Sequence, residues 1–158
     1  MKTNYLLPNK YKIYGWILFS MGIIAGISFS IAGYESNLFT TKVLTIYDGL
    51  NIKINGKSSF FTIQENSIVD ELITISIIIG GLIVGFTKEK IEDEFIYKLR
   101  KDSLVWAIIF NYVVLLFATL LIYDLAYFDV LIFNMFTPLI FFIVRFNFLK
   151  IKSGSDEE

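Results

Sequence analysis

The chain has 158 residues, enough for one domain, and 55% of them are hydrophobic, against roughly 45–50% in soluble domains. Its net charge of −1 gives no reason to expect a nucleic-acid partner, which needs a clustered basic surface. It contains neither cysteine nor histidine, which excludes disulfides, thiolate metal sites, a histidine general base and the usual zinc ligand.

Four stretches of the chain are long and apolar enough to cross a bilayer. A helix needs about 20 mainly apolar residues to do so. Residues 1–32 also resemble a secretory signal, but the apolar run is long and its glycines share one helical face, which favours a retained helix. The sequence therefore predicts an all-α membrane protein with four transmembrane helices. They are 14–33, 68–86, 104–123 and 130–149.

The basic residues predict how these helices are threaded. Eleven of the 14 lie in or beside the arm 1–13, the connection 87–103 and the tail 150–158. By the positive-inside rule these segments are cytoplasmic, and both the segment 34–67 and the turn 124–129 lie outside. The richness in Ile, Lys, Asn and Phe is typical of an AT-rich bacterial genome. We therefore expect a multi-pass protein of a bacterial cytoplasmic (inner) membrane.

The outer segment 34–67 differs in character from the predicted helices. It is rich in Thr, Ile, Val and Phe and carries the turn signals Asp48-Gly49 and Asn55-Gly56. We expect an extracytoplasmic antiparallel β-meander of two or three strands, too small to be stable alone. Its apolar face would rest on helix ends or on a partner protein. The strands are expected at about 38–47, 50–54 and 58–64, with Phe61 and Ile63 facing Leu50, Ile52 and Ile54.

Small residues mark the predicted packing faces of the first two helices. Each helix has a G-x-x-x-G pair, a spacing that permits close approach of two helix backbones. We expect the two helices to pack together within one subunit, with homodimerisation through either face as the alternative. The helix-packing residues are Gly15, Gly22, Gly26, Gly33, Gly81 and Gly85.

Four residues stand out inside the third and fourth predicted helices, where polar groups are costly. Asn134, Pro138 and Arg145 share one face, and Pro138 frees the carbonyl of Asn134 and permits a kink. We expect Asn111 to face this stripe. It would make either an interhelical hydrogen bond or a contact with a substrate or ion.

The connection 87–103 is the most charged part of the chain. As a helix it would place Ile91, Phe95 and Leu99 on one stripe, so we expect an amphipathic cytoplasmic helix that either lies at the membrane interface or extends the third span. Acids suit its N-terminus and bases the membrane surface, so the charge order needs no catalytic role. The acidic end would meet solvent, a cytoplasmic partner or Arg145. The candidate docking residues are Glu89, Glu92, Asp93 and Glu94.

The stretches "FTKEKIEDEFIYKLRKDSLVWA" and "FNMFTPLIFFIVRF" resemble a group of small, uncharacterised bacterial inner-membrane proteins. The resemblance covers about 85–150 and implies the four-span architecture without an activity. Pro138 departs from the pattern of the group's last span.

The chain shows no catalytic motif and no phosphate-binding glycine loop. We expect a non-enzymatic accessory or signalling membrane protein without cofactor or metal. Its expected partners are the lipid bilayer and a membrane or envelope protein bound through the outer sheet and the charged connection, with self-association into a homo-oligomer as a further option. The alternative is a subunit of a small oligomeric transporter or channel, based on Asn111, Asn134, Pro138 and Arg145.

Overall fold

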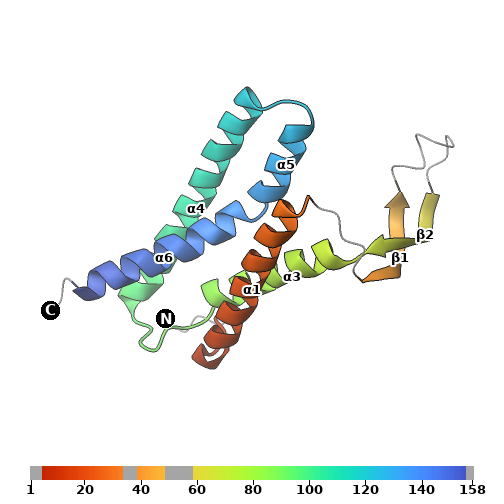
Figure 1. Cartoon of the computed structure of the whole chain (residues 1–158). Helices are drawn as coiled ribbons and strands as arrows, with labels where there is room; N and C mark the ends of the chain where they lie inside the picture. The colour runs from red at the N-terminus through yellow and green to blue at the C-terminus, as the bar shows by residue number, and fades with distance from the viewer. Residues whose placement is uncertain (1–4, 34–38, 49–58, 156–158) are drawn as a thin grey trace. The chain divides into compact units, whose positions relative to one another are not determined.

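The computed structural model describes residues 5–33, 39–48 and 59–155, which belong to two compact units treated separately below. One unit comprises residues 1–22 and 75–158, and the other residues 23–74. Helices account for 74% of the structure, which agrees with the predicted helical class (Figure 1). The elements are η1 (Asn9–Tyr11), α1 (Lys12–Ile31), β1 (Thr40–Asp48), β2 (Ser59–Ser67), α3 (Val69–Gly85), α4 (Glu94–Leu121), α5 (Leu125–Asn134) and α6 (Thr137–Ser155).

Helix α4 contains both the end of the charged connection and the predicted third span. It begins at Glu94 because Asp93 caps it, with its Oδ1 accepting a hydrogen bond of 2.8 Å from the amide of Ile96. It then runs for 28 residues, about 42 Å at 1.5 Å per residue. Of the two alternatives for the helix expected over 87–103, the one that extends the third span is present for residues 94–103, and the expected helix is absent over 87–93. Residues 87–93 form a non-helical connection, and 94–103 continue directly into the predicted third span.

The fourth predicted span is broken into two helices. Met135 and Phe136 interrupt the helix between α5 and α6, and the two parts are bent by 44°. The ring of Pro138 cannot donate a hydrogen bond to the carbonyl of Asn134, which explains why the helix breaks at this point. The expected kink is present.

The predicted outer turn 124–129 is mostly helical. Helix α5 already begins at Leu125, so the reversal of the chain is confined to Ile122–Asp124. Asp124 adopts a φ of 59°, a left-handed conformation that lets the turn close over so few residues. The loop is shorter than expected because Leu125–Asp129 extend the helix outward.

Aromatic side chains and small residues hold α4 and α6 together. Figure 1 shows α6 crossing the first half of α4 and α5 lying beside its second half. The stacked rings of Phe110 and Phe141 have centroids 4.3 Å apart across this interface. Ala107 of α4 and both Phe142 and Phe146 of α6 are buried, so small side chains on α4 make room for large ones on α6.

The first half of α1 packs on the second half of α3 at glycine positions. A Cβ atom added to Gly80 would lie 2.5 Å from the backbone nitrogen of Phe19, and one added to Gly22 would lie 2.9 Å from that of Ile77. Gly15 is likewise buried against α3. The expected packing of the first two helices within one subunit is therefore present in this part of the chain.

Two of the predicted packing glycines face a different helix. A Cβ at Gly81 would lie 2.5 Å from Leu139, and one at Gly85 would lie 2.5 Å from Phe142, both on α6. Helix α3 thus uses Gly80 toward α1, and Gly81 and Gly85 mainly toward α6. A single G-x-x-x-G pair does not distinguish these two partners, because neighbouring positions on a helix point in different directions.

The expectation that Gly33 packs against a helix is wrong. It lies beyond the end of α1 with a φ of +79°, and nothing lies within 4 Å of an added Cβ. It ends the helix instead, since its left-handed conformation suits glycine and its amide bonds to the carbonyl of Ser30 at 3.2 Å. Gly26, in the other unit, is half-buried.

The sheet in residues 23–74 is a two-stranded antiparallel hairpin in the described part of the chain. β1 pairs with β2 over Thr40–Asp48 and Ser59–Ser67, with Leu44 opposite Ile63. The expectation that Phe61 and Ile63 face Leu50, Ile52 and Ile54 stays a prediction, because β1 covers only one edge of β2. The expected strand 50–54 and the Asn55-Gly56 turn lie outside the described residues.

Two or three helical segments could cross a membrane by length and composition, judged on the described residues. Asn9–Ile31 and α4 qualify singly, and the bent pair α5–α6 qualifies if it is one span. Helix α3 has 17 residues, about 26 Å, and is slightly shorter than a typical span of about 20 residues. Membrane-spanning character is therefore supported, whereas the count of four spans stays a prediction.

Candidate functional site

The connection between α3 and α4 is fixed by the N-terminal arm. The amide of Leu7 donates to the carbonyl of Phe86 at 2.9 Å, and the amide of Lys88 donates to the carbonyl of Leu7 at 2.9 Å. The side-chain amide of Asn9 adds a bond of 2.7 Å to the carbonyl of Lys88. These contacts satisfy extended backbone that has no sheet partner of its own. An arm distant in sequence therefore orders the charged connection.

Glu89 joins three segments of the chain through two lysines. Its Oε1 pairs with Lys12 at the start of α1, and its Oε2 pairs with Lys150 near the end of α6 at 3.3 Å. The carboxylate side chain is only 11% exposed. Burial alone would raise the pKa of Glu89, but the hydrogen bonds and charges of Lys12 and Lys150 outweigh it and hold the pKa below its usual value.

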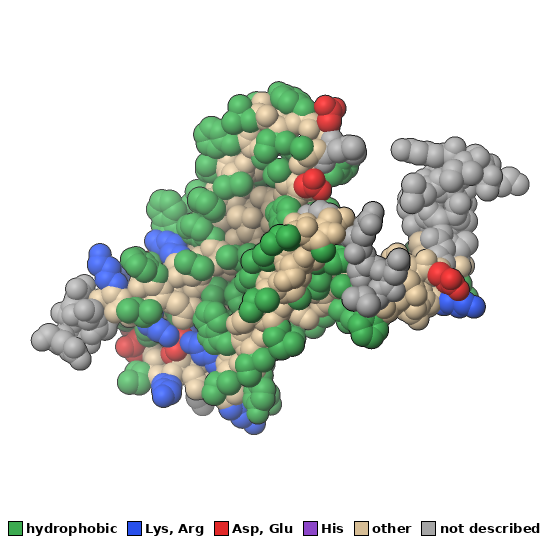
Figure 2. All heavy atoms as spheres, viewed as in Figure 1, with side chains coloured by type: hydrophobic (Ala, Val, Ile, Leu, Met, Phe, Trp, Pro, Cys, Tyr) green, Lys and Arg blue, Asp and Glu red, His purple; other side chains and the backbone are tan. Residues whose placement is uncertain are grey.

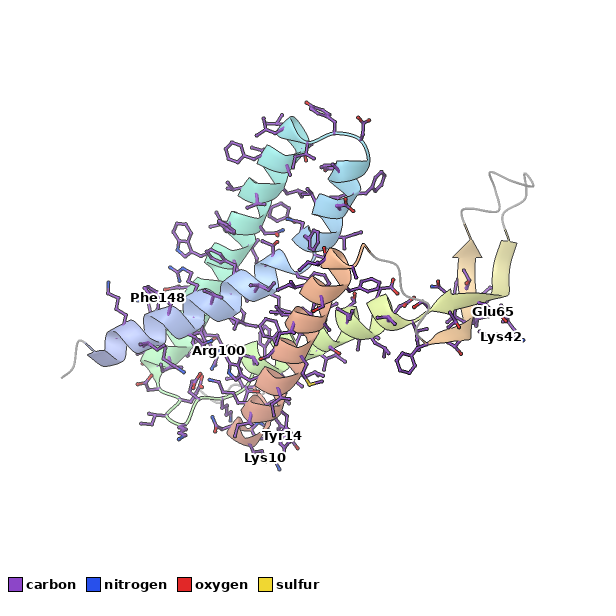
Figure 3. The ribbon with its side chains drawn as sticks, in the orientation of Figure 1. Lys10, Tyr14, Lys42, Glu65, Arg100 and Phe148 are labelled. Atoms are coloured by element: carbon purple, nitrogen blue, oxygen red, sulfur yellow. The ribbon has the colours of Figure 1, made fainter. Side chains whose placement is uncertain are left out.

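Glu92 is engaged by a buried arginine. Arg100 is 3% exposed and donates to the two carboxylate oxygens of Glu92 at 2.5 and 3.1 Å (Figure 3). It also donates to the carbonyl of Thr87 at 3.3 Å, and its guanidinium lies 5.1 Å from the ring centroid of Phe146. The bidentate pair and the ring compensate the two terminal nitrogens of the buried arginine, whereas its Nε is buried without a hydrogen-bond partner among the described residues.

Three of the four acidic residues predicted as a docking patch make contacts within the chain instead. Glu89 and Glu92 are paired, and Asp93 caps α4. Asp93 and Glu94 are both exposed, and Glu94 is the one of the four that takes part in none of these contacts. Arg100, which the sequence analysis did not single out, is the residue that organises this region. Its burial could have been anticipated only if the start of α4 had been placed at Glu94, because the pairing depends on a connection that doubles back on the helix.

Arg145 meets none of the acidic residues in the described chain. Its guanidinium donates to the hydroxyl of Ser103 at 3.2 Å and lies 5.6 Å from the ring centroid of Trp106. Of the three alternatives for the acidic end of the connection, pairing with Arg145 is not seen, because Glu92 pairs with Arg100 and Glu89 pairs with two lysines.

The predicted intramembrane polar residues are brought together in part. The amide of Asn134 donates to Oδ1 of Asn111 at 3.0 Å, so Asn111 does face the polar stripe of the fourth span. Pro138 lies in the first turn of α6, just beyond the helix break. Arg145 belongs to a separate set of contacts with Ser103 and Trp106. The four residues thus form two polar contacts rather than one continuous site.

An open cleft of about 830 Å³ lies beside Glu89. It is bounded by the start of α1, the connection before α4 and the end of α6. Apolar and basic side chains both line it. The lining residues are Asn9, Lys12, Ile13, Trp16, Glu89, Lys90, Ile91, Asp93, Phe95, Ile96, Lys150 and Ser153.

The hairpin carries an exposed apolar face. Leu44 lies opposite Ile63 in the register, and Ile46 and Phe61 lie two residues away from them along β1 and β2. These four residues, termed the hairpin face, are 63–70% exposed. Lys42 and Glu65, paired by the register, continue the same face with charges (Figure 3).

The described residues contain no group of three or more acidic side chains that could hold a metal ion. Comparison of the chain with protein-family models, with curated proteins and with solved structures finds no match. The functional argument therefore depends on the geometry of this chain alone.

Proposed function

We propose that the chain is a multi-pass protein of a bacterial cytoplasmic membrane that serves as a non-enzymatic accessory or signalling subunit. In this proposal α1, α3, α4 and the α5–α6 pair cross the bilayer. Both termini and residues 87–93 are cytoplasmic, and the hairpin lies outside. The distribution of basic residues and the apolar surface of α4 support this arrangement (Figure 2).

The observation that carries the proposed function is the hairpin face. A two-stranded hairpin is marginally stable alone. The face exposes four large apolar side chains, of the kind that occur at binding surfaces. Each of the two strands also has one edge without a strand partner among the described residues. An envelope protein that adds a strand to this edge and covers the apolar face would satisfy both features.

The charged connection is no longer proposed as a docking patch for a partner. Three of its four acids have internal roles, so the connection serves to fix α1, α4 and α6 to one another. Partner binding is therefore assigned to the hairpin.

In vivo cross-linking followed by purification tests this function. A photoreactive residue placed at Ile46 should give a cross-link to one envelope protein of defined mass. The double variant Leu44→Ser with Ile63→Ser should abolish that cross-link, because it removes the apolar contact.

Phe39→Ser is the matched control, since Phe39 is equally exposed in the same segment but lies before β1. This control should keep the cross-link. Cross-links only between two copies of the chain would assign the face to self-association instead. No cross-link, or equal loss in both variants, would refute the proposed partner.

A second candidate function is supported by the broken helix. Discontinuous helices with free carbonyls are used by transporters to bind ions near the bilayer centre. Here the break at Met135–Phe136 adjoins the Asn111–Asn134 hydrogen bond. Ion flux into liposomes containing the purified protein, reduced by Asn134→Leu, would favour this function. Flux equal to that of empty liposomes would exclude it.

A further inference from the structure

We propose that the cleft beside Glu89 binds the phosphate headgroup of an anionic phospholipid, an inference that rests on the membrane placement proposed above. The argument begins with where the cleft lies. Its walls are the start of α1, the end of α6 and the connection before α4, and all three belong to the side on which basic residues gather. That level of a membrane protein is occupied by lipid headgroups.

The cleft combines the two chemistries that a phospholipid presents. Lys12 and Trp16 lie one helical turn apart on α1, so the ammonium and the indole face the same space. Ile13 and Phe95 add apolar surface for the beginning of an acyl chain. Tryptophan is enriched at this level of membrane proteins because its ring is apolar and its N–H is polar.

The net charge of the cleft lining and the unused donors of its lysines favour binding of an added anion. Three lysines and two carboxylates line the cleft, a net charge of +1, and one carboxylate, Asp93, already caps α4. Lys12 and Lys150 share the single carboxylate of Glu89. Each ammonium has three donor hydrogens, so donors remain on both lysines after Glu89 is satisfied. A phosphate with several acceptor oxygens can use the remaining donors.

Figure 2 shows Lys and Arg side chains gathered in the lower part of the view, around the start of α1 and the end of α6. Apolar side chains cover the neighbouring surface of the same unit. The combination of basic and apolar side chains favours a lipid over a soluble phosphate compound, because a soluble compound would not need Ile13, Trp16 and Phe95 beside the lysines.

Fluorescence quenching by brominated lipid tests the proposal directly. Trp106→Phe leaves Trp16 as the single tryptophan, because the chain has two. The variant is placed in vesicles of phosphatidylcholine and phosphatidylglycerol, with bromine on one lipid or the other. We expect phosphatidylglycerol to occupy the site near Trp16 about fivefold more strongly than phosphatidylcholine, as favourable lysine contacts predict.

Charge variants identify the residues responsible. Lys12→Gln with Lys150→Gln should remove the preference, whereas Lys98→Gln with Lys101→Gln should retain it. The second pair removes the same charge from the exposed surface of the same unit without lining the cleft. Equal effects of the two pairs would show a general surface potential and would overturn the proposed site.

Glu89→Gln separates lipid binding from a merely structural role. It removes the competing carboxylate and releases both lysines, so the preference for phosphatidylglycerol should increase although the variant loses two ion pairs. A decrease would contradict the proposal. Loss of the preference on addition of inorganic phosphate would assign the cleft to a soluble anion. Absence of quenching by either lipid would place Trp16 outside the bilayer and would overturn the site, without bearing on the cross-link at the hairpin.

Discussion

At the scale of single residues, Glu89 is the group on which most contacts converge. Its carboxylate joins α1 to α6 through two lysines and is almost fully enclosed by them. Removing its charge leaves two ammonium groups close together without a counterion. Losing this carboxylate lowers the free energy of unfolding more than losing an exposed ion pair does, because the two remaining ammonium groups stay partly buried.

Glu89→Gln should therefore lower the free energy of unfolding by about 1–3 kcal/mol at neutral pH. Because the folded-state pKa of Glu89 lies below its usual 4.5, its contribution is present above that pH and is lost as the pH falls through the folded-state pKa. Thermal unfolding in detergent should show the gap between wild type and variant narrowing below pH 4.5. Glu94→Gln, at an exposed position, is the control and should change little. A gap that stays constant with pH would refute this account.

The hydrogen bond between Asn111 and Asn134 makes a second prediction at this scale. Hydrogen bonds between membrane helices contribute about 0.6 kcal/mol on average and up to about 1.7 kcal/mol. Asn111→Leu and Asn134→Leu should each lower stability in detergent, and the double variant should cost less than the sum. Tyr112→Phe, at an exposed neighbour, should be nearly neutral. Strictly additive losses would show that the two amides do not interact.

At the scale of elements, the glycines determine how closely helices approach. Gly80 is the tightest point between the first half of α1 and α3, because backbone rather than a flexible side chain opposes it. Gly80 was not predicted as a packing residue, because it stands beside Gly81 and outside the G-x-x-x-G spacing of Gly81 and Gly85. A Gly-Gly pair in a predicted span was the available signal.

Gly80→Ala should destabilise the protein by about 1–3 kcal/mol, because the added methyl group would overlap the backbone of Phe19. Ile79→Ala on the exposed side of the same helix removes more atoms but should stay within about 0.5 kcal/mol. Thermal unfolding of both variants in detergent makes the comparison. Equal stability of Gly80→Ala and wild type would show that α1 and α3 do not approach so closely.

The sequence predicted element types better than element ends. The hydrophobic runs predicted the membrane-spanning parts of α1, α3 and α4, and Pro138 predicted the bend between α5 and α6. The start of α4 was misplaced because it depends on Asp93 acting as a cap while Glu92 turns back to Arg100, a contact between residues eight apart. The sequence did not specify the pairing of β2 with β1, because the local turn signal at Asn55-Gly56 points to the segment 50–54, which lies outside the described residues.

At the scale of the whole molecule, the account makes one claim that the rest requires. In the proposed topology the hairpin and the connection 87–93 are on opposite sides of the membrane, which requires α3 to cross it. At 17 residues α3 is the shortest of the predicted spans. If it does not cross, an external partner for the hairpin and a cytoplasmic lipid site at Glu89 are incompatible.

Cysteine labelling in intact cells tests this claim most directly, because the chain has no cysteine of its own. Single substitutions Thr41→Cys, Lys90→Cys, Asp124→Cys and Ser153→Cys are exposed to a thiol reagent that does not cross membranes. The account predicts labelling at positions 41 and 124 in intact cells, and at 90 and 153 only after the cells are opened. Labelling at 41 and 90 under the same condition would contradict it.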